Sequence, residues 1–275
     1  MIIDVKSLVA KKKEEVKETI SKYPENEVKL SIIQVGDNSA SNSYVKGKLK
    51  DCEEVGIVGD LHKFDENVKP YTILKEIKKL NNDPSCYGII VQLPLPKQFT
   101  KEWIEVLTNT IDRYKDVDGF RKDSPFTPCT PKGIMSIIDY LWEQIGGSTL
   151  NGVVACVIGR SEIVGKPTVN LLIDRGCTVV NCNSHTRDLD FWLDKANIII
   201  TATGSRDILN MSRNVHWKEK IIIDVGINRD ENGKLCGDCS RDLYDEVKWI
   251  TPVPGGVGLM TRVSLLENVV QGLLV

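Results

Sequence analysis

Segments that favour strands alternate with segments that favour helices along the whole chain. Apolar runs rich in β-branched residues predict strands at 30–35, 87–92, 153–158, 178–182, 198–202 and 221–225. Helical periodicity lies at 5–23, 41–55, 71–81, 131–144, 165–175 and 261–274. Because strands that alternate with helices pair through crossover connections, this order predicts parallel βαβ units and an α/β fold.

The chain of 275 residues is long enough for two domains of ordinary size. Three prolines interrupt the periodicity in 123–131, and a self-contained series of strands and helices begins at Asn151. The final helix follows a loop rich in proline and glycine, and we expect it to return to the first domain. The predicted domains are 1–123 together with 259–275, and 124–258.

Charge and cysteine content limit the kinds of protein that fit. The formal net charge of −2 gives no reason to expect a nucleic-acid partner, and no apolar run approaches the ~20 residues that a membrane span needs. Five of the eight cysteines lie in or beside apolar segments, which is typical of reduced, packed thiols. Cys236 and Cys239 have the spacing of half a zinc knuckle, but no second pair completes it, so we predict no metal site. We expect a soluble, cytoplasmic protein.

One predicted strand delivers a single polar side chain at its end. Residues 88–91 form an apolar run like a parallel strand covered on both faces, and Gln92 follows before Pro94 and Pro96 stop the pairing. Open parallel sheets bind ligands beyond the carboxyl ends of their strands, so Gln92 is a candidate site residue. The alternative is a glutamine that only satisfies loop backbone.

A glycine turn between a strand and a helix predicts a phosphate site. The strand at 153–158 runs into Gly159, Arg160 and Ser161, and a helix follows from Gly165. Backbone N–H groups at such a turn attract an anion, and a guanidinium can grip a phosphate through two parallel hydrogen bonds. The spacing does not fit a P-loop, and Ser161 stands where the dinucleotide fingerprint has its second glycine. The alternative is a structural turn with a solvated arginine.

The segments beyond the other strand ends favour a dinucleotide. The second strand of this series ends without the Asp or Glu that binds the ribose of NAD, whereas Ser184 with Arg160 suits a 2′-phosphate. NADP is therefore favoured over NAD. Small or polar residues also follow the two later strands, at Thr203, Gly204, Gly226 and Ile227. We predict an NADP site formed by these residues and the glycine turn.

An early helix carries an aromatic ring and an amine on one face. Tyr44 and Lys48 are four residues apart, about 40° round the helix axis, so together they can stack on a flat heterocycle and exchange protons with it. The alternative is a pair of surface side chains with apolar stems. Asp118 supplies a carboxylate at a tight turn before Gly119. The same Asp-x-Asp-Gly pattern could be half a calcium loop, but the remaining ligands are absent.

Seven motifs in a fixed order give the chain a more specific likeness. They are the Tyr44/Lys48 pair, the segments 91–96, 115–120 and 128–131, the glycine turn at 159–167, and the segments 224–228 and 251–258. Together they resemble the methylenetetrahydrofolate dehydrogenase/cyclohydrolase family over nearly the whole chain. The resemblance implies an N-terminal folate-binding catalytic domain and a Rossmann-like NADP-binding domain, which flank a folate cleft in each subunit of a homodimer.

The resemblance also implies the reactions and the residue roles. It implies oxidation of 5,10-methylenetetrahydrofolate by NADP, then hydrolysis of the methenyl cation to 10-formyltetrahydrofolate. Lys48 is the implied acid–base residue, Tyr44 stacks on the folate, and Gln92 holds Lys48. Asp118 is implied to bind the amino and ring N–H groups of the pterin. The residues implied to line the folate cleft are Gly255, Gly256 and Val257.

Two other functions stay open. A different dinucleotide-dependent oxidoreductase of shikimate-dehydrogenase-like architecture, or a catalytically silent folate-binding protein, would share much of this pattern. The chain also departs from the family pattern in places: residues 121–123 stand where the family shows a His and an Asn, Asn183 replaces a His, and Leu259 replaces a Pro. These departures leave the implied chemical residues intact.

Overall fold

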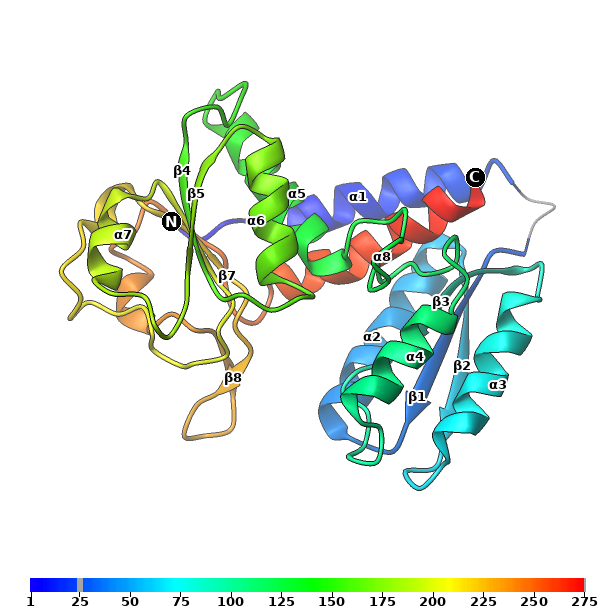
Figure 1. The fold of residues 1–275 in the computed structure, drawn as a ribbon. Helices are drawn as coiled ribbons and strands as arrows, with labels where there is room; N and C mark the ends of the chain where they lie inside the picture. The colour runs from blue at the N-terminus through cyan, green and yellow to red at the C-terminus, as the bar shows by residue number, and fades with distance from the viewer. Residues whose placement is uncertain (24–26, 275) are drawn as a thin grey trace. The chain divides into compact units, whose positions relative to one another are not determined.

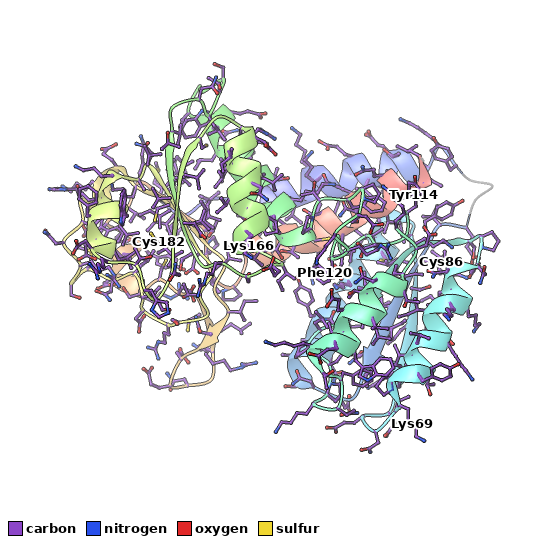
Figure 2. All side chains as sticks on the ribbon, in the orientation of Figure 1. Lys69, Cys86, Tyr114, Phe120, Lys166 and Cys182 are labelled. Carbon is purple, nitrogen blue, oxygen red and sulfur yellow. The ribbon has the colours of Figure 1, made fainter. Side chains whose placement is uncertain are left out.

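The computed structural model describes residues 1–23 and 27–274, which separate into two compact units. The first unit consists of Met1–Ala10 and Thr130–Thr261, and the second of Lys11–Cys129 with the chain from Arg262 onward. The boundaries of the two functional domains expected from the sequence stay a prediction. Residues 24–26 and 275 belong to the first of these predicted domains but lie outside the described residues. Figure 1 shows the ribbon, and Figure 2 shows the side chains that fill the interior of each unit.

The second unit is built on a three-stranded parallel sheet. Its strands are β1 (Lys29–Val35), β2 (Val58–Phe64) and β3 (Cys86–Val91), in the order β2-β1-β3. The helices that contribute to it are α1 (Val5–Ile20), α2 (Ser39–Val55), α3 (Pro70–Asn81), α4 (Lys101–Thr110) and α8 (Val257–Leu273). Side chains alternate between the two faces of β1 and β3. Residues of α1, α2 and α8 cover one face, and residues of α3 and α4 cover the other (Figure 1).

The final helix, α8, packs into the core of the second unit, which corresponds to the first of the two domains predicted from the sequence. The prediction that the final helix returns to that domain is confirmed. Apolar residues of α8 share a buried cluster with Leu30 and Ile32 of β1: Leu265, Leu266, Val269 and Val270. The buried Asn268 donates hydrogen bonds from Nδ2 to the main-chain oxygens of Val117 (2.8 Å) and Thr127 (3.0 Å). The helix therefore fills the core and also ties down the loop that follows β3.

The first unit is built on a five-stranded parallel sheet. Its strands are β4 (Val154–Ile158), β5 (Thr178–Cys182), β6 (Ile198–Thr201), β7 (Ile221–Asp224) and β10 (Trp249–Ile250), in the spatial order β10-β7-β6-β4-β5. The chain adds β5 on one side of β4, and then β6, β7 and β10 on the other side. The direction reverses between β4 and β6, which is the point where open α/β sheets bind their ligands. The predicted α/β class is confirmed.

Helices and a hairpin complete the first unit. They are α5 (Cys129–Gln144), α6 (Gly165–Asp174), α7 (Leu189–Lys195), the short 3-10 helices η1 (Trp217–Glu219) and η2 (Arg241–Leu243), and the hairpin of β8 (Asn228–Arg229) and β9 (Leu235–Cys236). α6 packs against β4 and β5, and α7 packs near β4. The hairpin is an antiparallel addition to an otherwise parallel unit.

The sequence predicts no element where β2, α4 and α7 lie. β2 is an edge strand of exposed and half-buried residues, so it lacks the apolar run of a central strand. α4 begins after Thr100, whose hydroxyl accepts a hydrogen bond from the N–H of Trp103 (3.4 Å). α7 has only seven residues, which is too few to show a clear helical period.

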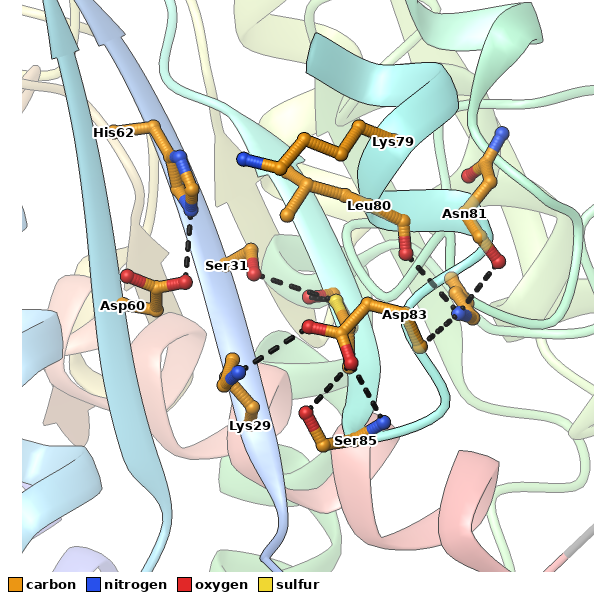
Figure 3. Close-up of polar contacts among 12 residues, drawn as sticks. Lys29, Ser31, Asp60, His62, Lys79, Leu80, Asn81, Asp83 and Ser85 are labelled. Atoms are coloured by element: carbon orange, nitrogen blue, oxygen red, sulfur yellow. Dashed lines mark hydrogen bonds and ion pairs between the residues drawn. The ribbon is translucent and has the colours of Figure 1, made fainter.

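Polar contacts surround the turn between α3 and β3 (Figure 3). The carboxylate of Asp83 pairs with Lys29 at 3.2 Å. The Nζ of Lys115 donates to the main-chain oxygens of Asn81 and Asp83, each at 2.8 Å. The side chain of Lys115 therefore ties the residue before Asp116 to the end of α3.

Cysteines in the structure are free, and most are buried. Seven of the eight are buried and Cys236 is half-buried. The sulfurs of Cys156 and Cys182, on the neighbouring strands β4 and β5, lie 3.6 Å apart. Within residues 1–23 and 27–274, no group of three or more His, Cys, Asp and Glu side chains is placed to hold a metal ion. In the same ranges, no helix has the length and apolar character that crossing a membrane requires.

Candidate active site

Lys48 lies on α2, one of the helices that cover the sheet of the second unit. Asn38 caps this helix, because its Oδ1 accepts hydrogen bonds from the N–H groups of Ala40 (3.0 Å) and Ser41 (3.1 Å). The cap sets the start of the helix shortly after β1. Tyr44 and Lys48 then follow one turn apart on one face.

Tyr44 and Gln92 enclose the amine group of Lys48. Lys48 is only 5% exposed, and its Nζ donates to Oε1 of Gln92 at 3.2 Å and lies 5.2 Å from the centre of the Tyr44 ring. Gln92 is held in turn, since its N–H donates to the oxygen of Ile33 (2.8 Å) and its Nε2 donates to that of Leu93 (2.7 Å). The amide nitrogen of Gln92 thus satisfies backbone while its oxygen faces Lys48. The structure brings the three residues together, and their chemical roles stay a prediction.

A buried carboxylate lies one turn beyond Lys48 on α2. Asp51 pairs with Nζ of Lys13 (2.5 Å) and with Nε of Arg262 (2.9 Å). These two cations compensate its charge, so neutralising Asp51 does not require Lys48. Gly47 makes room for the arginine, because a Cβ there would lie 1.8 Å from Nη1 of Arg262. α2 is therefore joined to α8 by the ion pair of Asp51 with Arg262, next to Gly47.

The loop after β3 holds two aspartates in different settings. Asp116 is buried and accepts hydrogen bonds from the N–H groups of Arg121 (2.9 Å) and Phe120 (3.4 Å). Burial raises the pKa of Asp116 to about 6, although these hydrogen bonds oppose the change. Asp118 is half-buried at the next turn, and within the described part of the chain no hydrogen bond joins its carboxylate to Lys48. Gly119 is required there, because its φ is +72° and a Cβ would lie 2.8 Å from the nitrogen of Pro128.

A cavity of about 430 Å³ opens where the sheet of the first unit reverses direction. Four of the predicted dinucleotide residues line it: Gly159 and Arg160 after β4, Ser184 after β5, and Thr203 after β6. The other lining residues were not among the predicted site residues, and they are Ile158, Asn183, Thr186, Leu189, Ala202, Ser205 and Ile208. All but Ile158 follow the ends of β5 and β6, so the rule that led to Ser184 and Thr203 could have found them.

Two glycines bring the walls of this cavity close together. Gly159 has φ +127°, and a Cβ on it would lie 2.6 Å from the main-chain oxygen of Ala202. A Cβ on Gly165, the first residue of α6, would lie 2.4 Å from the oxygen of Gly159. Asn181 of β5 donates from Nδ2 to that same oxygen at 2.7 Å. The backbone at the strand end thus carries no side chain and is held in place, which fits the close approach of a phosphate.

The other predicted dinucleotide residues do not line the cavity. Ser161 faces the start of α6, where its Oγ accepts hydrogen bonds from the N–H groups of Val164 and Gly165, both at 3.2 Å. Gly204 is exposed with φ +65°, and Ile227 is 67% exposed. Gly226 is buried, and a Cβ there would lie 2.1 Å from Oδ1 of Asp238.

Gly255, Gly256 and Val257 form the turn into α8. Gly255 has φ +105°, and a Cβ on the buried Gly256 would lie 2.4 Å from the oxygen of Pro252. Val257 is the first residue of α8 and is buried. Two glycines are therefore needed for the turn itself, and a folate-binding role for these residues stays a prediction.

An open parallel sheet with a cavity at its reversal point defines the nucleotide-binding class of α/β proteins. Two family models match this chain. Residues 3–118 match the catalytic domain of tetrahydrofolate dehydrogenase/cyclohydrolase, and residues 128–274 match its NAD(P)-binding domain. The chain belongs to the tetrahydrofolate dehydrogenase/cyclohydrolase family.

Individual relatives agree with this assignment. The chain is 39% identical to the bifunctional protein FolD of Halalkalibacterium halodurans, in an alignment that covers 98% of each protein. It is 41% identical to the crystal structure of the bifunctional enzyme FolD, a methylenetetrahydrofolate dehydrogenase/cyclohydrolase, from Campylobacter jejuni, with a TM-score of 0.90 over 99% of this chain and 98% of that one. The enzyme from Trypanosoma brucei, complexed with NADP and an inhibitor, is 26% identical, with a TM-score of 0.87 over 99% and 96% of the chains.

Proposed function

We propose that this protein is a bifunctional one-carbon folate enzyme. It oxidises 5,10-methylenetetrahydrofolate to the methenyl cation with NADP, and it hydrolyses that cation to 10-formyltetrahydrofolate. The observation that carries the proposal is the buried Lys48 amine, held by Gln92 and packed beside the Tyr44 ring, in a chain that matches both family domains. A buried amine with one defined acceptor is suited to move a proton at a fixed place.

Tyr44 and Asp118 are the proposed substrate-binding residues. An aromatic ring next to the Lys48 amine can stack on the flat pterin and present its one-carbon unit to Nζ. The half-buried carboxylate of Asp118 can accept hydrogen bonds from the amino and ring N–H groups of the pterin. Gly255, Gly256 and Val257 are proposed to contribute to the folate site, because they form a tight turn with little side-chain bulk.

The oxidation step asks the protein mainly to bind and orient. NADP, when bound, supplies the hydride acceptor. The bare backbone at Gly159 and the exposed guanidinium of Arg160 are proposed to bind its phosphates, with Ser184 at the 2′-phosphate. Because hydride transfer moves no proton, this half-reaction depends on positioning rather than on an acid or a base.

The hydrolysis step needs a proton to move between two atoms. Water adds to the methenyl carbon, and a base accepts one of its protons; the bond from that carbon to the ring nitrogen then breaks, the nitrogen takes up a proton, and the remaining hydroxyl proton passes to solvent as the formyl C=O forms. Nζ of Lys48 is proposed to carry out both transfers. Gln92 orients Nζ through the 3.2 Å hydrogen bond. The net reaction consumes one water and releases one proton.

We also propose that the protein acts as a cytoplasmic homodimer with neither nucleic acid nor membrane as a partner. The free, mostly buried cysteines suit a reducing compartment. The net charge of −2 offers no excess of positive charge for a polyanion. Light scattering at several protein concentrations tests the dimer.

The proposed function is tested by assaying the purified protein with 5,10-methylenetetrahydrofolate and either NADP or NAD. With NADP, we expect the amount of reduced nicotinamide to equal the sum of the methenyl and 10-formyl products, and we expect added methenyl substrate to yield the 10-formyl product. Folate binding without turnover would instead identify a silent folate-binding protein. Turnover of shikimate without turnover of the folate would identify the other oxidoreductase.

A further inference from the structure

Asp238 is a fully buried carboxylate in the segment between Cys236 and Cys239. It follows β9 of the hairpin in the first unit and is 0% exposed. The two cysteines of this segment do not form a metal site within the described ranges, so the Cys-x-x-Cys spacing has no metal-binding explanation in the structure. Aspartate is rarely buried to this extent unless its charge is compensated.

Every polar contact of the Asp238 side chain comes from a hydrogen-bond donor. Its Oδ2 accepts from Oγ1 of Thr201 (2.9 Å), from the N–H of Thr203 (2.7 Å) and from Oγ1 of Thr203 (2.8 Å). Its Oδ1 accepts from Nδ2 of Asn228 at 2.9 Å. None of these donors is a cation. Four hydrogen bonds to neutral donors therefore compensate the buried carboxylate.

The contacts to Thr203 connect Asp238 to the dinucleotide cavity. Thr203 lines that cavity, as does Ser205 two residues later. The hydroxyl of Thr203 donates to Asp238 and accepts a hydrogen bond from the N–H of Ser205 at 3.0 Å. Asp238 thus fixes both the backbone and the hydroxyl of Thr203, and through that hydroxyl it fixes the loop up to Ser205.

Asp224, at the end of β7, holds the other side of Asp238. It accepts hydrogen bonds from the N–H groups of Asp238 and Cys239, each at 2.9 Å. Two glycines leave room for the pair: a Cβ on Gly226 would lie 2.1 Å from Asp238, and one on Gly237 would lie 1.9 Å from Asp224. The backbone at these two glycines is therefore packed closely against the two carboxylates.

We propose that Asp238 is a positioning residue for the dinucleotide site, acting through Thr203 and the loop to Ser205. This inference rests on the proposed function, because it concerns the same cofactor. Asparagine at this position has the shape of aspartate but only one acceptor oxygen. In the Asp238→Asn variant, the NH₂ group would face either the N–H of Thr203 or Nδ2 of Asn228, so a donor would stand opposite a donor in either orientation and the contacts that hold the loop would weaken.

The test compares the wild type with Asp238→Asn and with Asp245→Asn, a control at an exposed aspartate of the same unit. The measurements are the Kd for NADP by calorimetric titration, kcat and KM for NADP, the cyclohydrolase rate and the circular-dichroism spectrum. We expect Asp238→Asn to raise Kd and KM for NADP about tenfold, with the spectrum and the cyclohydrolase rate close to those of the wild type. Asp245→Asn should match the wild type throughout.

Each result has a defined meaning. If the wild type binds NADP and Asp238→Asn binds it equally well, the positioning role is wrong and the proposed function stands. If the wild type binds neither NADP nor NAD, both proposals fail.

If Asp238→Asn does not fold, two variants of Thr203 provide the test. We expect Thr203→Val to bind NADP several-fold more weakly than the wild type, and Thr203→Ser to bind it as the wild type does. Wild-type affinity in the valine variant would overturn the inference.

Discussion

The amine of Lys48 donates a hydrogen bond to the side-chain oxygen of Gln92 at 3.2 Å, across 44 positions of sequence. The two residues come from different elements, since Lys48 lies on α2 and Gln92 follows β3. Gln92 is itself fixed by backbone contacts at both its main chain and its amide nitrogen. The direction of the lysine side chain is therefore set by a rigid strand end.

Removing the acceptor from this contact should impair hydrolysis more than oxidation. We expect Gln92→Leu to lower the cyclohydrolase kcat by about 10- to 100-fold, because the lysine would no longer be held at the reacting atoms. The dehydrogenase should lose less, since it needs no proton transfer. The exposed Gln271→Leu is the control and should retain both activities. Full cyclohydrolase activity in Gln92→Leu would show that the contact has no function.

The glycine before Lys48 should be essential for the stability of the α2–α8 contact. In Gly47→Ala the new Cβ would lie 1.8 Å from Nη1 of Arg262, so the guanidinium must shift, and its pairing with Asp51 would weaken. We expect the free energy of unfolding, measured by urea denaturation, to fall by about 1–3 kcal/mol despite the better helix propensity of alanine.

Gly258→Ala is the matched control for this substitution. Gly258 also lies in a helix, but no atom would approach a Cβ there within 4 Å. This variant should be as stable as the wild type, or more stable by up to about 1 kcal/mol. If both alanine variants gain stability, the Arg262 contact at Gly47 is not restrictive.

Asp116 should make the protein more stable as the pH falls from 7 towards 4. Burial raises its folded-state pKa from the ordinary value of 3.8 to about 6, so the folded state holds a proton that the unfolded state has released. The resulting stabilisation is fully present below the unfolded pKa and is lost as the pH rises through about 6. Its upper limit is ~3 kcal/mol, from 1.36 kcal/mol per pKa unit.

Urea denaturation of the wild type and Asp116→Asn at pH 7, 6, 5 and 4 measures this effect. The difference in the free energy of unfolding should shift in favour of the wild type at each lower pH, because only the wild type can take up the proton. A difference that stays constant over this range would contradict the raised pKa.

The site residues that follow strand ends could be predicted from the sequence. Gln92, Gly159, Ser184 and Thr203 all follow apolar runs, and the carboxyl ends of parallel strands share one edge of a sheet. The polar edge strand β2 could not be found in this way, because it has no apolar run. The order of the five strands was also not readable, since local patterns carry no information on which strands become neighbours.

The proposed role of Asp238 could not be predicted from the sequence. Its two flanking cysteines have the spacing of half a zinc knuckle, and nothing local marks the aspartate between them. Its partners Thr201 and Thr203 are 37 and 35 residues away. Hydrogen bonds over such separations follow from the fold and leave no spacing pattern. The structure adds two observations that the sequence cannot give: Asp238 is buried, and the neighbouring Gly237 has no room for a side chain.

Lys48 is proposed to move the proton in hydrolysis and not to be needed for hydride transfer. Assays of both activities in Lys48→Met, with Lys46→Met at an exposed position of the same helix as the control, test it most directly. We expect Lys48→Met to lower the cyclohydrolase rate by at least about 100-fold and to keep a measurable dehydrogenase rate, while Lys46→Met keeps both. An equal loss of both activities in Lys48→Met, or a cyclohydrolase rate that matches the wild type, would contradict it.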